Sequence, residues 1–151
     1  MFAQNNSIEL KDVKKVSEEE KKFIKFYFEA ERYKLLEDYD QAVSYYQKCI
    51  EIIPKESSPY YQIGKIQLYI FNELATAEYY IKESINLNPE NEWCYYDLIT
   101  IYGVQNNTKE AQKTYEKLIE INPENKLYYF ESIRGLIELK NYRAAIKLIK
   151  K

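Results

Sequence analysis

The chain has 151 residues, enough for one ordinary domain, and 46% of them are hydrophobic, enough to supply a core. The net charge is only −2, so the composition does not favour binding to nucleic acid or to an anionic membrane. No apolar run approaches the ~20 residues that a membrane-spanning helix needs, so we expect no membrane insertion.

The first part of the chain predicts a lead-in followed by two helices. Residues 1–16 are polar and lack helical periodicity, which indicates a flexible N-terminal segment. Ser17 and Glu20 then form a capping box, which marks the start of a helix. This helix is expected to run from Ser17 to about residue 37. A second helix over 40–53 is expected to end before Pro54.

The rest of the chain predicts three further helix pairs, whose short connections favour antiparallel neighbours. Ser58 and Thr108 are expected to cap two of these helices. The predicted helices span 59–71, 74–87, 91–105, 108–121, 125–139 and 142–150.

Adjacent aromatic pairs recur four times, at steps of 34, 35 and 34 residues, and an alanine and a proline keep nearly the same spacing. The pairs are Phe26-Tyr27, Tyr60-Tyr61, Tyr95-Tyr96 and Tyr129-Phe130, the alanines are Ala42, Ala77, Ala111 and Ala145, and the prolines are Pro54, Pro89 and Pro123. Self-similarity at a fixed period of this size predicts a stack of repeats rather than a single closed core. The second repeat has one extra residue, most simply in the turn at Asn72-Glu73, because a loop absorbs an insertion at little cost.

This pattern resembles the tetratricopeptide repeat family, whose unit is a 34-residue helix–turn–helix. The resemblance covers roughly residues 23–151 and implies an all-α, right-handed α-solenoid of about four such hairpins. The expected solenoid spans 17–151, in units of about 17–56, 57–91, 92–125 and 126–151. One position of the unit is usually small. Ala30 and Gly64 fit it, whereas Ile99 and Ile133 do not, which predicts local repacking or a slight change of helix crossing in the last two units.

In this family the first helix of each unit lines the concave face, so the resemblance implies a groove for a protein or peptide there. The predicted groove residues are Tyr27, Tyr61, Lys65, Tyr69, Trp93, Tyr96, Thr100, Phe130 and Arg134. A row of rings suits an extended or helical peptide, because tyrosine and tryptophan dominate interface hot spots. The alternative is that these rings pack against one another or against the neighbouring helix.

Some members of the family hold the C-terminal carboxylate of chaperones with a clamp of lysine, asparagine and arginine side chains. At the matching positions this chain has Tyr27, Glu31, Gln62, Trp93 and Asp97. Most of the donors that a carboxylate requires are missing, so we do not expect this chain to bind chaperone tails in that way.

The sequence lacks the usual signals of chemistry. It has no histidine, and its three glycines form no phosphate-binding loop, so we expect no enzymatic activity, no cofactor and no metal site. Cys49 and Cys94 form no CxxC pair, which favours reduced, buried thiols, although a disulfide between them stays open without a Cα distance.

We therefore predict an interaction scaffold or adaptor that binds a protein or peptide segment. One alternative is a structural module that forms a homo-oligomer through its uncapped C-terminal helix, and another is a docking segment of a larger protein. The expected localisation is cytoplasmic. The run Phe2-Ala3-Gln4-Asn5 looks like the end of a cleaved signal peptide, so an exported, periplasmic protein is the alternative.

Overall fold

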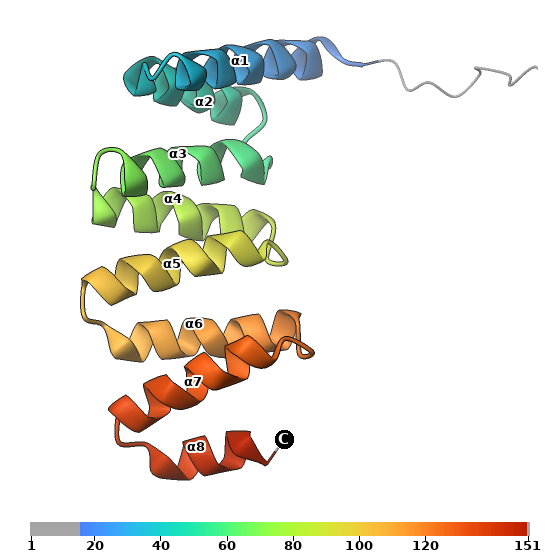
Figure 1. The fold of residues 1–151 in the computed structure, drawn as a ribbon. Helices are drawn as coiled ribbons and strands as arrows, with labels where there is room; N and C mark the ends of the chain where they lie inside the picture. The colour runs from blue at the N-terminus through green and yellow to red at the C-terminus, as the bar shows by residue number, and fades with distance from the viewer. Residues whose placement is uncertain (1–15, 151) are drawn as a thin grey trace, which may run out of the picture.

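The computed structural model describes residues 16–150, which fold into eight α-helices and contain no strand (Figure 1). The helices are α1 (Glu18–Leu35), α2 (Tyr39–Ile52), α3 (Ser57–Tyr69), α4 (Leu74–Leu87), α5 (Glu92–Val104), α6 (Thr108–Ile121), α7 (Lys126–Glu138) and α8 (Tyr142–Ile149). Consecutive helices pair into four stacked hairpins, so the predicted all-α solenoid is confirmed. The lead-in predicted for 1–16 lies outside the described residues, apart from the exposed Val16.

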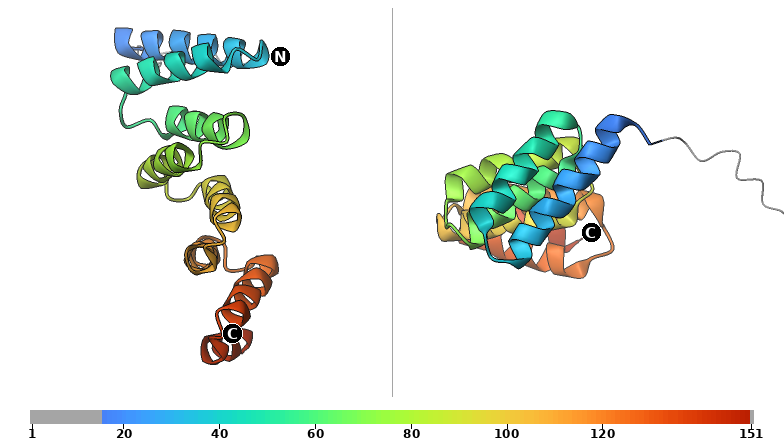
Figure 2. Two further views of the ribbon diagram at one scale, coloured as in Figure 1. Left: turned by 90° about the vertical axis from the view of Figure 1, so that its left-hand side faces the viewer. Right: turned by 90° about the horizontal axis from the view of Figure 1, so that it is seen from above.

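The helices form two layers, because each hairpin places one helix on either side of the stack. In the left-hand view of Figure 2, α3, α5 and α7 run down one side and α4, α6 and α8 down the other. Contacts between α3 and α5 join neighbouring hairpins within the odd layer, and contacts of α2 with α3, of α4 with α5 and of α6 with α7 join them across the layers. Each hairpin is therefore buried against the next.

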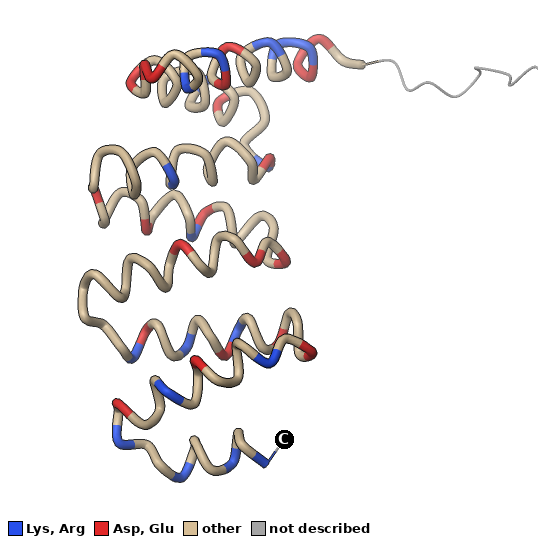
Figure 3. Tube along the Cα trace, in the orientation of Figure 1, with Lys and Arg blue, Asp and Glu red and all other residues tan. Residues whose placement is uncertain are grey.

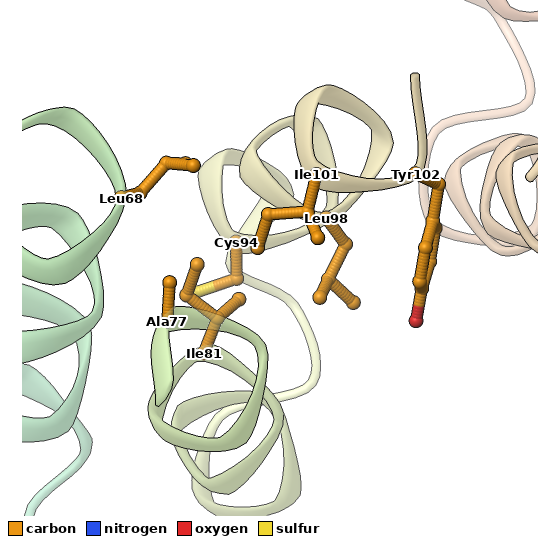
Figure 4. Close-up of a cluster of buried hydrophobic side chains, with 7 residues drawn as sticks. All are labelled: Leu68, Ala77, Ile81, Cys94, Leu98, Ile101 and Tyr102. Carbon is orange, nitrogen blue, oxygen red and sulfur yellow. The ribbon is translucent and has the colours of Figure 1, made fainter. Parts of the chain in front are cut away.

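The core runs through the stack instead of closing inside one hairpin. Figure 4 shows a cluster in which side chains from α3, α4 and α5 meet between the second and third hairpins. It consists of Leu68, Ala77, Ile81, Cys94, Leu98, Ile101 and Tyr102. Because the cluster is shared by two hairpins, neither of them can bury its apolar side chains alone.

The first ring of each repeated aromatic pair packs towards the even helix of its own hairpin. Phe26 lies 5.9 Å from the ring of Tyr45 on α2, and Tyr60 lies 6.4 Å from the ring of Tyr80 on α4. Tyr95 belongs to a buried cluster with Leu118 of α6. The first ring of the pair therefore packs inward in the first three hairpins.

Each hairpin turn contains one residue in the left-handed conformation, immediately before the residue that caps the second helix. These residues are Glu37, Asn72, Asn106 and Lys140, with φ of 58°, 55°, 52° and 56°. The side chains of the caps Asp38, Asn107 and Asn141 then accept a hydrogen bond from a backbone N–H of the following helix. The second hairpin differs, because its cap Glu73 makes no such bond.

Two predicted caps are wrong. Thr108 is the first residue of α6, and Asn107 caps the helix by accepting a hydrogen bond from the N–H of Glu110. Helix α3 begins at Ser57, one residue before the predicted cap Ser58. The Ser58 hydroxyl instead shares a hydrogen bond with the Tyr27 hydroxyl, 2.7 Å away, so it joins two hairpins.

The extra residue of the second repeat lies in the turn, as predicted. In the other three hairpins the N–H of the cap residue donates to the carbonyl five residues back, as from Asp38 to Tyr33. In the second hairpin the N–H of Glu73 reaches the carbonyl of Gln67, six residues back. The turn therefore widens by one residue while both helices keep their buried faces.

The two helices of each of the first two hairpins pack more closely together than α5 and α6 of the third hairpin do. At Gly64 an added Cβ would lie 2.6 Å from Ile81 Cγ1, so α3 and α4 approach as closely as a glycine permits. Ile99 and Ile133 stand at the same position of the last two hairpins. A bulky residue at this position favours a wider separation of the two helices, so the repacking around Ile99 and Ile133 stays a prediction.

Candidate functional site

The surface formed by α1, α3, α5 and α7, here called the odd-helix face, carries more of the exposed large apolar side chains that lie within helices than the even helices do. Several of them recur at two equivalent positions of the repeat, each in three of the four odd helices. The first group is Ile24, Trp93 and Leu127, and the second is Leu35, Tyr69 and Val104. Repetition at this spacing makes rows that run along the stack rather than scattered single residues.

Charged side chains are sparse in the middle of this face. Figure 3 shows that α3 and α5 are almost free of charge compared with α1 and α6. Helix α3 carries only Lys65, and α5 carries only Glu92 and Asp97. The central part of the odd-helix face is therefore aromatic and apolar.

The predicted aromatic residues divide into an exposed and a half-buried group. Trp93 is 69% exposed, Phe130 is 64% exposed and Tyr69 is also exposed. Tyr27, Tyr61 and Tyr96 are half-buried. The exposed rings can meet a partner directly, whereas the half-buried ones also pack against the neighbouring protein.

The half-buried Tyr27 joins the first two hairpins. Its hydroxyl bonds to Ser58, and its ring meets the ring of Tyr46 edge-on, with centroids 5.5 Å apart. Beside it, Lys34 Nζ lies 2.6 Å from Glu31 Oε2 and donates to Gln62 Oε1 at 3.2 Å. The side chains of α1 thus hold α3 through polar contacts.

A buried carboxylate joins the second and third hairpins. Asp97 of α5 is 7% exposed and accepts a hydrogen bond from the hydroxyl of Tyr69 on α3. Lys65 lies over the ring of Tyr61, with its Nζ 5.3 Å from the centroid. The predicted residues Tyr61, Lys65 and Tyr69 are therefore brought together around Asp97, which was not among the predicted groove residues.

A chain of hydroxyl groups joins the third and fourth hairpins. Tyr96 of α5 donates to the hydroxyl of Tyr128 on α7 at 2.9 Å, and Tyr128 donates to the carboxylate of Glu92. The exposed ring of Trp93 lies 6.0 Å from that of Tyr96. Trp93 therefore rests on a ring that is itself fixed in place.

The remaining predicted residues lie at the edge of this network. Thr100 is exposed and donates from its hydroxyl to the Tyr96 carbonyl at 3.0 Å. Arg134 is exposed and lies 2.5 Å from Glu131 one helical turn away. Phe130, by contrast, has a large exposed ring, so it is the freest of the predicted residues on α7.

Sequence reasoning missed Asp97, Glu92 and Tyr128 as parts of this site. The sequence does contain a sign that Asp97 is unusual, because it is the only charged residue between Trp93 and Val104 in an otherwise apolar helix. A lone charge in such a helix indicates a buried group with partners. Tyr128 had no comparable signal, because tyrosine suits exposed and buried positions equally well.

Burial changes the pKa of several groups here. It raises the pKa of Tyr69 to about 12, and the hydrogen bond to Asp97 acts in the same direction. It also raises the pKa of Asp97, while the hydroxyls of Tyr69 and Tyr61 and the charge of Lys65 oppose that rise. The network therefore stabilises a carboxylate that burial disfavours.

We expect the pKa of Asp97 to lie above the usual ~3.9 of an aspartate, and Tyr69→Phe to raise it further. The substitution removes a hydrogen bond that favours the ionised form. The pKa of Asp97 is higher in the folded state than in the unfolded state. Its contribution to the free energy of unfolding is therefore complete at a pH below the unfolded-state pKa, and it is lost as the pH rises through the folded-state pKa. NMR titration of the carboxyl carbon measures the shift, with Tyr142→Phe on α8 as the distant control. An unchanged or lower pKa in Tyr69→Phe would contradict the assignment.

The described residues also bear on metal binding and on thiol chemistry. Among them no cluster of three or more acidic, cysteine or histidine side chains could hold a metal ion. Cys49 and Cys94 are both free and buried, as the sequence favoured, and burial raises the pKa of each thiol to about 11. Neither thiol is therefore activated as a nucleophile. Within residues 16–150 no helix is long and apolar enough to cross a membrane.

Comparisons with known proteins agree with this architecture. The family model of the tetratricopeptide repeat matches residues 26–56 and 94–125. A search of curated protein sequences finds no match.

Several solved structures have a similar fold at low sequence identity. MamA is 20% identical over 85% of this chain and 74% of its own, with a TM-score of 0.66. YrrB, described as a TPR protein with an unusual peptide-binding site, is 19% identical over 87% of this chain and 68% of its own, with a TM-score of 0.67. The first TPR of Spaghetti, bound to the HSP90 peptide SRMEEVD, is 20% identical over 80% of this chain and 97% of its own, with a TM-score of 0.63. At these identities the likeness concerns the fold alone.

Proposed function

The chain belongs to the tetratricopeptide repeat family, and from this premise we propose that it is an interaction scaffold that holds a protein or peptide segment along the odd-helix face. Repeats of this family are generally interaction modules rather than enzymes. Two of the similar structures concern peptide binding, by YrrB and by the first TPR of Spaghetti. Both observations support a binding role for this chain. The kind of ligand follows from the residues on its own odd-helix face.

The observation that carries the proposal is the row of exposed rings on a face whose other tyrosines are fixed by hydrogen bonds. Trp93 and Phe130 contribute little to the core and much apolar surface to solvent. Trp93 is supported from beneath by Tyr96, which Tyr128 holds in turn. A ring that rests on a fixed neighbour, as Trp93 does, loses less entropy when a partner covers it, which favours affinity.

Chaperone tails remain an unsuitable ligand. Where the family places donors for a carboxylate, the structure has Asp97 buried among hydroxyl groups and Glu31 paired with Lys34. A carboxylate on the ligand would meet negative charge at both positions. The favoured partner is therefore an apolar or aromatic segment whose backbone and side chains lie across the rings.

We expect the double variant Trp93→Ala/Phe130→Ala to lose peptide binding by at least about tenfold per ring, because each ring is a candidate hot spot. Peptides selected from a random display library on the intact chain serve as probes, and fluorescence anisotropy measures the dissociation constants. The matched control is Tyr79→Ala/Tyr142→Ala, which removes two exposed rings from the even layer. Equal weakening in both variants, or none in the first, would refute the odd-helix face as the site.

Self-assembly through α8 remains the second candidate, because this short helix exposes Tyr142, Ile146 and Ile149. Light scattering of the intact chain over a range of concentrations separates it from the scaffold. A mass that stays monomeric supports a free binding face. A stable dimer that selects no peptide would instead point to assembly as the function.

A further inference from the structure

A pocket of about 240 Å³ opens where α5, α6 and α7 meet. It exists because the third hairpin is less closely packed than the first two. Ile99 of α5 lines the pocket, and Gly103 and Gly135 contribute no side chain to its wall. An added Cβ at Gly103 would meet no atom within 4 Å, whereas the second hairpin has the buried Leu68 at the equivalent position. The space that Leu68 fills in one repeat is left open in the next.

The inner wall of this pocket contains a buried acceptor that lacks a donor. Gln112 is only 4% exposed, and its amide nitrogen donates to Ser132 Oγ at 2.7 Å and to Glu116 Oε1 at 3.3 Å. Its other atom, Oε1, is buried without a hydrogen-bond partner. The carboxylate of Glu116 accepts hydrogen bonds, so the amide nitrogen faces it, and the oxygen lies against Gly135 of the pocket wall, where an added Cβ would be 2.7 Å from it. A buried acceptor without a partner costs free energy that a ligand donor would recover.

The charges around the pocket favour a cation. Glu131 and Glu138 line it with negative charge, and Arg134 alone carries positive charge. Arg134 is paired with Glu131 at 2.5 Å, which leaves Glu138 as the unmatched charge in the lining. The rings of Tyr102 and Tyr115 and the side chain of Ile99 supply apolar walls for the stem of a long side chain.

We propose that this pocket binds the basic side chain of a segment lying on the odd-helix face, with an arginine as the best fit. The guanidinium has five N–H donors in a planar fork, so it can reach Gln112 Oε1 and an acidic side chain at once. Arg134 connects the two sites, because it lines the pocket and belongs to the predicted groove. The inference rests on the proposed function for its ligand, and it adds a subsite with a chemistry that the rings do not provide.

The test uses three small probes on the intact chain, so it does not depend on finding the natural partner. These are the N-acetyl amides of arginine, citrulline and norleucine, followed by ¹H–¹⁵N NMR. We expect the arginine probe to bind in the millimolar range, as suits a ligand of this size. It should shift the Gln112 side-chain amide and the backbone amides of Gly103 and Gly135. The citrulline probe keeps the shape without the charge and is expected to bind at least about tenfold more weakly, and the norleucine probe to leave these signals unmoved.

The deciding variant is Gly103→Leu, which fills the pocket as Leu68 fills its counterpart. It should abolish the shifts, whereas Gly103→Ala at the same position should keep them. Gln112→Met is the second variant, because it removes the acceptor at nearly constant volume, and it is expected to weaken the arginine probe at least tenfold. Circular dichroism checks that the variants are folded.

Three results would overturn the proposal: no shift with the arginine probe, equal binding of citrulline, or unchanged binding in Gly103→Leu. If the proposed peptide-binding function is wrong instead, the binding experiments give a different set of results. In that case Trp93→Ala/Phe130→Ala would leave selected peptides bound, while the arginine probe would still shift Gly103 and Gln112. The two hypotheses therefore fail separately.

Discussion

Replacing Tyr128 with alanine is expected to lower the free energy of unfolding by about 4 kcal/mol, the range found when a buried aromatic ring is removed. Tyr128 is 1% exposed and packs with Tyr95 and Leu118. Because it lies on α7 and its partners lie on α5 and α6, the substitution weakens the contact between the third and fourth hairpins as well as the local core. Most domains are stable by only ~5–15 kcal/mol, so this is a large fraction of the total.

Tyr128→Phe separates the ring from its hydroxyl. It keeps the packing and removes the hydrogen bonds to Tyr96 and Glu92, so a loss of only about 1 kcal/mol is expected. Glu92 is half-buried and still accepts from Asn122 at 3.3 Å, which limits the cost. Tyr129→Phe, on the neighbouring half-buried tyrosine, serves as the control and should change stability little.

Urea denaturation measures these values with two probes. Circular dichroism follows the whole stack, and the fluorescence of Trp93, the only tryptophan, reports on α5, because its ring lies 6.0 Å from that of Tyr96, which bonds to Tyr128 of α7. A stack of repeats need not unfold in one step. We therefore expect the fluorescence transition of Tyr128→Ala to precede the transition by circular dichroism. If Tyr128→Ala lowers the free energy of unfolding by less than about 1 kcal/mol, the ring does not hold the third and fourth hairpins together.

The second large effect is expected at Gly64, where Gly64→Ile should cost about 3 kcal/mol by overpacking. The Cβ of any substituent would meet Ile81 Cγ1 at 2.6 Å and the Ile81 backbone nitrogen at 3.3 Å. Ile81 is fully buried and β-branched, so its side chain cannot rotate away freely. The helices α3 and α4 must then separate.

Gly103→Ala is the matched control, because both glycines lie within odd helices of the same stack. The added methyl group at Gly103 meets no atom within 4 Å, and alanine favours the helix by up to about 1 kcal/mol. Thermal and urea unfolding should therefore show Gly64→Ile less stable and Gly103→Ala equal to or more stable than the parent chain. A stable Gly64→Ile variant would mean that the closely packed hairpins can open at little cost.

The fold was predictable because its determinants recur in the sequence at the spacing of the repeat. The prolines Pro54, Pro89 and Pro123 each follow the end of a helix within two residues. Ala42, Ala77 and Ala145 are buried where two helices meet. Each of these residues acts within one hairpin or between adjacent hairpins, so a periodic pattern is enough to identify the contact that it makes.

The capping residues were less predictable, because several side chains near a helix start can serve as caps. Asn107 and Thr108 are adjacent, and both are good cap residues, so the choice depends on the left-handed turn at Asn106 that precedes them. Ser58 was assigned as a cap from its local sequence, yet its hydroxyl bonds to Tyr27 of the neighbouring hairpin. A local rule cannot anticipate a partner that lies 31 residues away.

The sequence by itself determined the repeat, the number of hairpins and the place of the insertion. These follow from residue size, backbone conformation and period, which are properties of short segments. Only the tertiary structure decided which tyrosines are exposed, that Asp97 and Tyr128 connect neighbouring hairpins, and that Gly103 and Gly135 leave a pocket beside Gln112. The physical reason is that burial and hydrogen bonding depend on how closely two helices approach. That distance is set by all the side chains between them and not by any one residue.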